Sequence, residues 1–281
     1  MRIALVQVDS PAGEPVGDRR ARIDALVRSL STADPGADLV VLPELWAAGY
    51  FAFDSYAAAA EPFDGPTVDA ARGWARELGA YVHLGSFVER DGHGRLSNTA
   101  VLLSPEGETV HVYRKIHVFG HASREAELLT PGDALPVATT PFGRLAATTC
   151  YDLRFPELWR RLVDGGAQLV VVPAAWPAAR REHWRLFTSA RAVEEQVLVI
   201  ACNAVGVQGG VELGGYSRVV DPWGTVLAEA ATAPGITWCD TDPGVVDRAR
   251  AEFPVLADRR EDLPVACDAA GHRPYAGQVG S

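Results

Sequence analysis

Three residues of reactive types stand where predicted buried strands end. Glu44 follows the apolar run in LVVLPELW, Lys115 follows VHVYR, and Cys150 ends RLAATTC. A carboxylate can take a proton, an ammonium group can stabilise an oxyanion, and a thiol can attack a carbonyl carbon. Open α/β sheets gather functional groups at the ends of their strands, so these three residues are candidate functional groups.

Cys150 stands a few residues before Pro156, which predicts a sharp bend from a strand into a helix. Backbone N–H groups point outward at such a bend. We therefore expect the bend to favour the Cys150 thiolate over the thiol and to offer the Tyr151 N–H to an oxyanion. The structural alternative is that Cys150 is a small buried apolar side chain.

Lys115 is the only lysine among 26 basic residues, the others being arginines. Ammonium and guanidinium differ in size, hydration and acidity. A single lysine kept in such a chain indicates a chemical task that arginine does not perform, with chance as the alternative.

The composition limits the classes of protein to be considered. The 281 residues are 48% apolar and 22% charged, which is typical of a soluble globular protein. A net charge of −10 argues against nucleic acid as a partner. The cysteines show no metal or disulfide spacing, and no segment fits a signal peptide or a membrane span. We expect a cytoplasmic protein that binds neither nucleic acid nor membrane.

Short apolar runs alternate with helical patterns along the whole chain, which predicts an α/β fold with a sheet core. The small, polar residues 266–281 are predicted to form a flexible tail, which leaves residues 1–265 as one domain. Strands are predicted at residues 1–8, 37–43, 80–88, 98–103, 108–113, 143–150, 168–173, 197–202, 215–220 and 236–241. Helices are predicted at residues 19–31, 66–78, 156–164 and 181–196.

One segment is repeated within the chain. GADLVVLPELW at residues 36–46 and GAQLVVVPAAW at residues 166–176 agree at seven of eleven positions. Glu44 of the first copy corresponds to Ala174 of the second. The shared residues indicate two related halves, and the difference at Glu44 indicates that only the first copy carries the chemistry. Chance likeness of two apolar strands is the alternative.

The motifs LPELW, YRKIH and CYDLRFPEL together resemble those of the carbon-nitrogen hydrolase (nitrilase) superfamily. The resemblance continues through TPGD, the stretch from His183 to Gln196, YSRVVDPWG and FPVLADRREDL, so it covers nearly the whole chain. It implies a four-layer α-β-β-α sandwich of two pseudo-symmetric halves, commonly assembled as a homodimer. Among its members, the chain is most similar to the Nit-type ω-amidases and related bacterial amidases.

The resemblance also implies a Glu-Lys-Cys triad that hydrolyses a small-molecule amide. Cys150 corresponds to the nucleophile, which forms a thioester and releases ammonia. Glu44 corresponds to the general base, and Lys115 to the cation that stabilises the transition state. The resemblance implies neither a metal nor an organic cofactor. Many members carry a second glutamate near the lysine; here EAELLTPGD makes Glu125 the best match and Glu127 its rival.

The expected substrate follows from the same resemblance. In the amidase branch the arginine of CYDLRF, here Arg154, lies near the pocket, and a guanidinium pairs well with a substrate carboxylate. This implies a short dicarboxylic acid monoamide such as 2-oxoglutaramate or succinamate. A structural salt bridge of Arg154 with Asp152 or Glu157 is the alternative. The segment with Trp176, Arg180 and Arg181 departs from the animal ω-amidases and is expected to reshape or recharge the pocket wall.

Other functions stay open at this stage. Deaminated glutathione and N-carbamoyl compounds are alternative substrates, and a non-catalytic interaction protein on the same fold is an alternative of another class. His117, His121 and Glu125 superficially suggest a metal-binding helix face, but Gly120 and the absence of HExxH favour a loop. A cysteine-histidine hydrolase lacks an identifiable histidine near Cys150.

Overall fold

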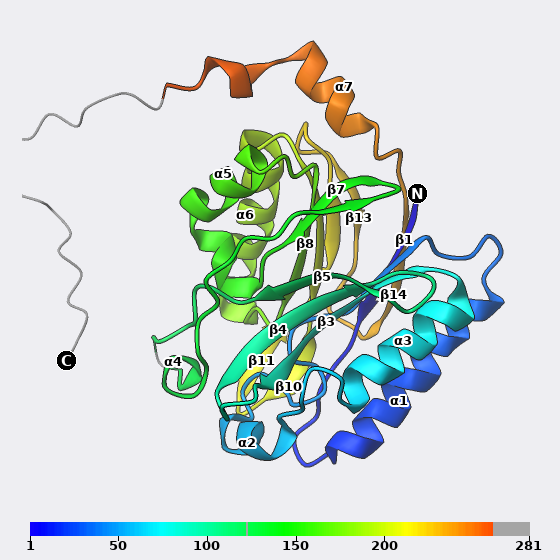
Figure 1. Ribbon diagram of the computed structural model, residues 1–281, viewed down its shortest axis with the longest axis vertical. Coiled ribbons are helices and arrows are strands. Elements are labelled where there is room, and N and C mark those ends of the chain that lie inside the picture. Colours follow the sequence, from blue (N-terminus) through cyan, green and yellow to red (C-terminus); the bar gives the residue numbers. More distant parts are fainter. Residues whose placement is uncertain (122, 261–281) are drawn as a thin grey trace, which may run out of the picture.

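Two six-stranded sheets lie at the centre of the fold (Figure 1), in a computed structural model that describes residues 1–121 and 123–260. The first sheet has the order β14-β1-β2-β3-β4-β5, with bounds Gly235–Asp240, Arg2–Gln7, Leu39–Val41, Tyr81–Arg90, Leu96–Leu103 and Thr109–Arg114. The second has the order β13-β12-β9-β8-β7-β6, with bounds Val226–Glu229, Arg218–Val220, Leu198–Asn203, Leu169–Ala174, Gly143–Ala147 and Ala138–Thr140.

The two sheets share one topology. β1, β2 and β3 are parallel, as are β7, β8 and β9. In each sheet one antiparallel strand lies on one side of the parallel set, β14 in the first sheet and β6 in the second. Two strands that pair antiparallel lie on the other side, β4 and β5 in the first sheet and β12 and β13 in the second. The strands of the repeated segment, β2 and β8, occupy the same central place. The two predicted pseudo-symmetric halves are therefore present.

Helices cover the outer face of each sheet (Figure 1). α1 (Val16–Arg28) and α3 (Pro66–Leu78) pack their apolar faces on the first sheet, with Ile23 and Trp74 buried there. α5 (Pro156–Asp164) and α6 (Arg181–Glu194) cover the second sheet. Apolar side chains of both sheets fill the space between them. The layers follow the order α-β-β-α, as the family resemblance implies.

All ten predicted strands and four predicted helices are found, with differences at their ends. The strand predicted at 143–150 ends at Ala147, because Thr149 and Asp152 form a capping box that starts a 3₁₀ turn at Cys150. α1 begins at Val16 rather than at residue 19, directly after Pro15. Pro66 and Gly79 bound α3 at the predicted residues.

Several short elements were not predicted from the sequence, because they are too short to show a periodic pattern. They are β6, β10 (Val205–Gln208), β11 (Val211–Gly214), β13, α2 (Tyr56–Ala59), α4 (Glu125–Leu128), α7 (Val245–Glu252) and five 3₁₀ helices. β10 and β11 form a separate hairpin. The predicted tail, residues 266–281, and the domain boundary at residue 265 lie outside the described residues.

None of the helices within residues 1–121 and 123–260 combines the length and the apolar character that a membrane span requires.

Candidate active site

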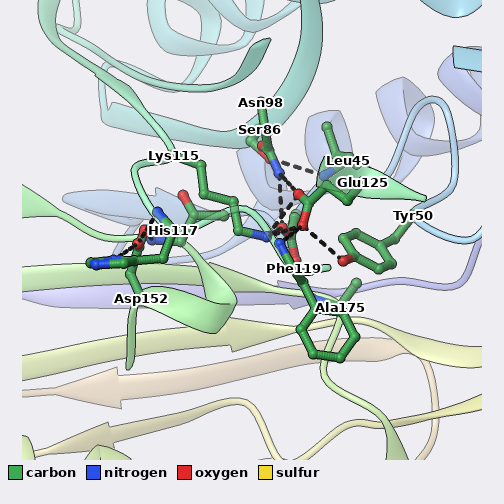
Figure 2. A network of polar contacts seen from close by, with 12 residues as sticks. Leu45, Tyr50, Ser86, Asn98, Lys115, His117, Phe119, Glu125, Asp152 and Ala175 are labelled. Atoms are coloured by element: carbon green, nitrogen blue, oxygen red, sulfur yellow. Dashed lines mark hydrogen bonds and ion pairs between the residues drawn. The ribbon is translucent and has the colours of Figure 1, made fainter. Parts of the chain in front are cut away.

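Lys115 lies at the centre of a buried polar cluster just beyond the end of β5. Its Nζ donates to Glu44 Oε1 at 2.9 Å and to both carboxylate oxygens of Glu125 at 2.8 and 2.9 Å. The three side chains are fully buried or nearly so. Figure 2 shows Lys115 pointing toward Glu125, with Asn98 and Tyr50 around the pair. The sequence-predicted Glu44 and Lys115 are thus in direct contact.

A close approach of two backbone segments holds the Lys115 strand end in place. Gly132 of TPGD donates its N–H to the Lys115 carbonyl at 2.9 Å. A Cβ atom at Gly132 would lie 2.2 Å from the Arg114 carbonyl oxygen, so a side chain cannot fit there. The TPGD turn therefore packs against the segment that presents Lys115, which gives this motif a structural role.

Glu44 is positioned by the loop after β2 and by a bulge in the neighbouring strand β3. Leu45 has a φ of 45°, and its N–H donates to Ser86 Oγ at 3.0 Å. A Cβ at Gly85 would meet the Pro43 carbonyl oxygen at 1.9 Å, so only glycine allows this approach. The pairing of β3 with β4 shifts register at the same place.

The two copies of the repeated segment meet at Glu44. Its Oε2 accepts the Ala175 N–H at 2.9 Å, and its own N–H faces the Ala174 carbonyl at 3.4 Å. Glu44 Oε1 also accepts from Asn98 Nδ2 at 2.8 Å. The pseudo-symmetry thus serves the site, because the second copy supplies backbone groups that hold the carboxylate of the first.

Cys150 begins the 3₁₀ turn Cys150–Arg154 with a φ of 46°, so the expected sharp bend is present. The side chain is 7% exposed. Asp152 holds the turn: its Oδ2 accepts the Thr149 N–H at 2.9 Å and the Tyr113 hydroxyl at 2.7 Å. Its Oδ1 accepts the His117 N–H at 2.9 Å. One buried carboxylate therefore ties the Cys150 turn to the segment on either side of Lys115.

The expectation that the bend favours the thiolate of Cys150 is wrong for this structure. Burial raises the pKa of the Cys150 thiol well above its usual range, and the Glu44 carboxylate adds to this rise while Lys115 opposes it. A 3₁₀ turn of five residues offers little helix dipole to compensate. The thiol form is therefore favoured before a substrate binds.

The other members of the cluster respond to the same burial. Burial raises the pKa of Glu44, and Lys115 offsets part of that rise. Burial alone would lower the pKa of Lys115, but the carboxylates of Glu125 and Glu44 together raise it well above its usual range. Lys115 is therefore held as a cation, and Glu44 is a stronger base than an exposed glutamate.

The structure distinguishes Glu125 from Glu127. Glu125 is buried and accepts hydrogen bonds from Lys115, from the Tyr50 hydroxyl at 3.0 Å and from the Phe119 N–H at 2.7 Å. The Glu127 side chain is 69% exposed and lies 3.5 Å from Arg124. Only Glu125 belongs to the cluster.

Sequence reasoning did not find Asn98 or Tyr50. Asn98 bonds both Glu44 and Glu125, and a buried asparagine within the apolar strand LSNTAVLL was the available signal. Tyr50 gave no such signal. His117 lies in a loop, where its ring bonds Asp152 at 2.8 Å and stacks on Phe155, so the helical metal-binding face does not exist.

A cleft opens directly above Cys150. It contains about 330 Å³ of empty space, including open solvent at its mouth. Tyr151, Arg154, Ala175 and Trp176 contribute to its walls, so the predicted Tyr151, Arg154 and Trp176 all lie around Cys150. The remaining lining residues are Tyr50, Phe51, Phe119, Pro177 and Arg180.

Arg154 reaches the cleft from the turn that begins with Cys150. Its guanidinium lies over the Trp176 ring, 4.7 Å from the centroid, and one nitrogen lies 3.4 Å from His183 Nδ1. No ion pair joins Arg154 to Asp152, Glu157 or any other carboxylate in the described part of the chain. The Asp152 carboxylate bonds Thr149, Tyr113 and His117 instead. The salt-bridge alternative for Arg154 is therefore wrong.

The fold and the arrangement of the site are those of a hydrolase of carbon–nitrogen bonds. Residues 2–251 match the carbon-nitrogen hydrolase family, and the chain belongs to this family. It is accordingly a hydrolase that acts on carbon–nitrogen bonds other than peptide bonds.

Named relatives are similar over almost their full length. The 2-oxoglutaramate amidase of Paenarthrobacter nicotinovorans is 39% identical, with 93% of this chain and 90% of the relative aligned. Human omega-amidase NIT2 is 34% identical over 93% of this chain and 96% of the relative. A solved structure of a variant of the Nesterenkonia sp. AN1 amidase, with acrylamide added at its active-site cysteine, has a TM-score of 0.76. It is 29% identical and covers 92% of this chain and 99% of that one.

Proposed function

We propose that this protein is an ω-amidase that hydrolyses short dicarboxylic acid monoamides such as 2-oxoglutaramate through a thioester on Cys150. The observation that carries the proposal is the contact of Lys115 with Glu44 and Glu125 beside the cleft that Cys150 and Arg154 line. Arg154 forms no ion pair with a carboxylate of the described residues. The similarity to the 2-oxoglutaramate amidase and to omega-amidase NIT2 supports the same substrate class.

The first half of the reaction forms the thioester. Cys150 Sγ attacks the amide carbon while Glu44 takes the thiol proton, which the raised pKa of Glu44 favours. We assign the proton transfer to Oε2, because its partner, the Ala175 N–H, belongs to a residue that lines the cleft. Lys115 and the Tyr151 N–H stabilise the oxyanion. The C–N bond then breaks, and Glu44 returns the proton to the leaving nitrogen, which departs as ammonia.

The second half hydrolyses the thioester. Glu44 takes a proton from a water molecule, whose oxygen attacks the thioester carbon. The C–S bond breaks, the acid leaves, and the proton on Glu44 returns to Cys150. Glu125 and Asn98 touch no reacting atom in this scheme: they hold Lys115 and Glu44 in position.

Arg154 is assigned to the far carboxylate of the substrate. Its guanidinium lies over the Trp176 ring and lines the cleft, and one of its nitrogens makes a long contact with His183 Nδ1. Its other donors are available to a substrate carboxylate. The empty space above Cys150 is small even when the open solvent at its mouth is included, which favours a short linear substrate.

Ammonia release tests the function directly. The purified chain and its Cys150→Ala variant would be incubated with 2-oxoglutaramate, succinamate, deaminated glutathione and N-carbamoyl amino acids. We expect release from the first two substrates by the wild type and none by the variant. Release only from deaminated glutathione or only from N-carbamoyl compounds would refute the ω-amidase assignment. Silence of the folded wild type on all four would support a non-catalytic role.

We also propose that the protein is a homodimer. Val193, Trp223 and Phe253 form an exposed apolar patch: Trp223 stacks on Phe253, and Gly224 packs against Val193. Contiguous apolar patches on a folded surface usually mark an interface. Light scattering should give twice the chain mass of 30.0 kDa. The Phe253→Glu variant should give the mass of one chain.

A reducing compartment such as the cytoplasm fits the proposed chemistry. The three described cysteines, Cys150, Cys202 and Cys239, are free and buried. The nucleophile has to stay a thiol, and reducing compartments keep thiols reduced. Cell fractionation with an antibody against the chain tests the location.

A further inference from the structure

Two arginines line the cleft above Cys150, and none of the described residues that line it is acidic. Arg154 comes from the turn Cys150–Arg154, and Arg180 ends the 3₁₀ helix Ala178–Arg180 that follows β8. The Arg180 guanidinium lies over the Phe119 ring, 5.7 Å from its centroid. Within residues 1–121 and 123–260, no carboxylate forms an ion pair with either arginine. The cleft therefore has two positive charges at its wall that no carboxylate of the described residues pairs with.

The two guanidinium groups interact with each other. Burial lowers the pKa of Arg154, and the positive charge of Arg180 lowers it further. A guanidinium stays protonated at such a site, so both charges persist. An anion placed between the two guanidinium groups is attracted to both, and these attractions offset the repulsion between Arg154 and Arg180. A further cation placed there would be repelled by both.

The charge changes sign between the lining of the cleft and the buried cluster beside Cys150. The buried cluster behind Cys150 holds two carboxylates, Glu44 and Glu125, and one ammonium group, Lys115. Its sum is negative when both carboxylates are ionised. A substrate with a carboxylate at one end and a neutral amide at the other is therefore oriented with the amide inward and the carboxylate at the arginines.

We propose that Arg180 is a specificity-determining residue that acts with Arg154 to select amides carrying a carboxylate and to reject amides that also carry an α-ammonium group. The inference rests on the proposed function, which assigns Arg154 to the substrate carboxylate. The accepted class is the anionic monoamide of a short dicarboxylic acid. The rejected class is the amide of an amino acid, such as asparagine or glutamine, whose ammonium group would lie beside two guanidinium groups.

The chain provides a matched control in the next residue. Arg181 carries the same charge, but its guanidinium lies over the Tyr216 ring at 5.0 Å, and Arg181 does not line the cleft. Arg181→Gln therefore removes a charge of the same kind from the same segment without changing the wall of the cleft.

The test uses pairs of substrates that differ by one ammonium group: succinamate with asparagine, and glutaramate with glutamine. Butyramide, which has no carboxylate, is the neutral reference. kcat/KM would be measured for the wild type, Arg180→Gln, Arg180→Lys and Arg181→Gln. A unit charge about 5 Å away at an effective dielectric constant of about 20 to 40 changes binding by at least about tenfold.

Arg180→Gln should therefore lower kcat/KM for succinamate by at least about tenfold, mainly through KM. It should also lower the succinamate-to-asparagine ratio by at least about tenfold, and it should lower kcat/KM for the neutral butyramide less than kcat/KM for succinamate. Arg180→Lys should restore most of the ratio, because the charge returns. Arg181→Gln should behave as the wild type does.

An unchanged succinamate-to-asparagine ratio in Arg180→Gln, with an active wild type, would overturn the inference and leave the proposed function intact. An equal fall in the ratio for Arg181→Gln would also overturn it, because a distant charge would then suffice. A folded wild type that hydrolyses neither succinamate nor glutaramate would overturn the proposed function, and the inference with it.

Discussion

Acid should destabilise this protein through a histidine in the core between the two sheets. His83 on β3 is fully buried, and neither of its ring nitrogens has a hydrogen-bond partner among the described residues. His111 on β5 lies on the far side of Leu102 in the strand register, and its Nε2 is 3.0 Å from the Pro136 carbonyl oxygen. Burial, assisted by His111, lowers the pKa of His83 from 6.5 to about 3.

The direction of the pH effect follows from which state binds the proton. The unfolded chain has the ordinary histidine pKa, so it takes up a proton below about pH 6.5, whereas the folded protein does not until about pH 3. The contribution of His83 to stability is therefore complete above pH 6.5 and is lost as the pH falls from there toward 3. Relative to pH 8, the contribution of His83 to the free energy of unfolding is smaller by about 2 kcal/mol at pH 5 and by about 3 kcal/mol at pH 4.

Urea unfolding followed by tryptophan fluorescence measures this loss, with His83→Leu as the perturbation. Leucine fills a similar volume and has no group that titrates or lacks a partner. We expect the variant to be within about 1 kcal/mol of the wild type at pH 8. Between pH 8 and pH 5 it should lose about 2 kcal/mol less of its free energy of unfolding than the wild type does.

His93 provides the control, because it is exposed in the turn between β3 and β4. His93→Leu should lose as much stability on acidification as the wild type does. If His83→Leu and the wild type lose the same free energy of unfolding between pH 8 and pH 5, the buried ring has no role in the acid response, and this prediction is refuted.

Two further predictions concern the groups that hold the site together. Glu125→Gln removes one of the two carboxylates that raise the pKa of Lys115, so kcat for succinamate should fall by at least about 100-fold. Glu127 is exposed, so Glu127→Gln should change kcat by less than about twofold. Equal effects of the two variants in steady-state assays would contradict the assignment of Glu125. Asp152→Asn replaces one carboxylate oxygen, which has two partners at the Cys150 turn, by an amide NH2 group that cannot accept from them. Urea unfolding should therefore show a loss of about 3 kcal/mol, and kcat should fall more than KM rises. A stable variant with normal kcat would show that Asp152 does not position the turn.

The fold was predictable from the sequence as far as local patterns reach. The buried strands β2, β8 and β9 are nearly continuous apolar runs, and Pro66 and Gly79 mark both ends of α3. The repeated segment predicted two related halves. Elements of three or four residues, such as β6 and β13, carry no periodic signal, and their pairing with distant strands creates them.

The reactive residues were predictable because their motifs are local. LPELW, YRKIH and CYDLRFPEL each identify one candidate without reference to the others. The choice between Glu125 and Glu127 was not predictable, because both lie in the short helix α4 and only the fold decides which side chain faces Lys115.

The sequence by itself therefore determined the family, the layers and the types of reactive group. The tertiary structure decided the electrostatics of the site. It buried Cys150, Glu44 and Lys115 together, which reversed the expected direction of the pKa shift at Cys150. It also left Arg154 and Arg180 at one cleft without carboxylate partners among the described residues. Burial and charge separation depend on distances between segments that are far apart in the chain, and no local pattern in a sequence contains those distances.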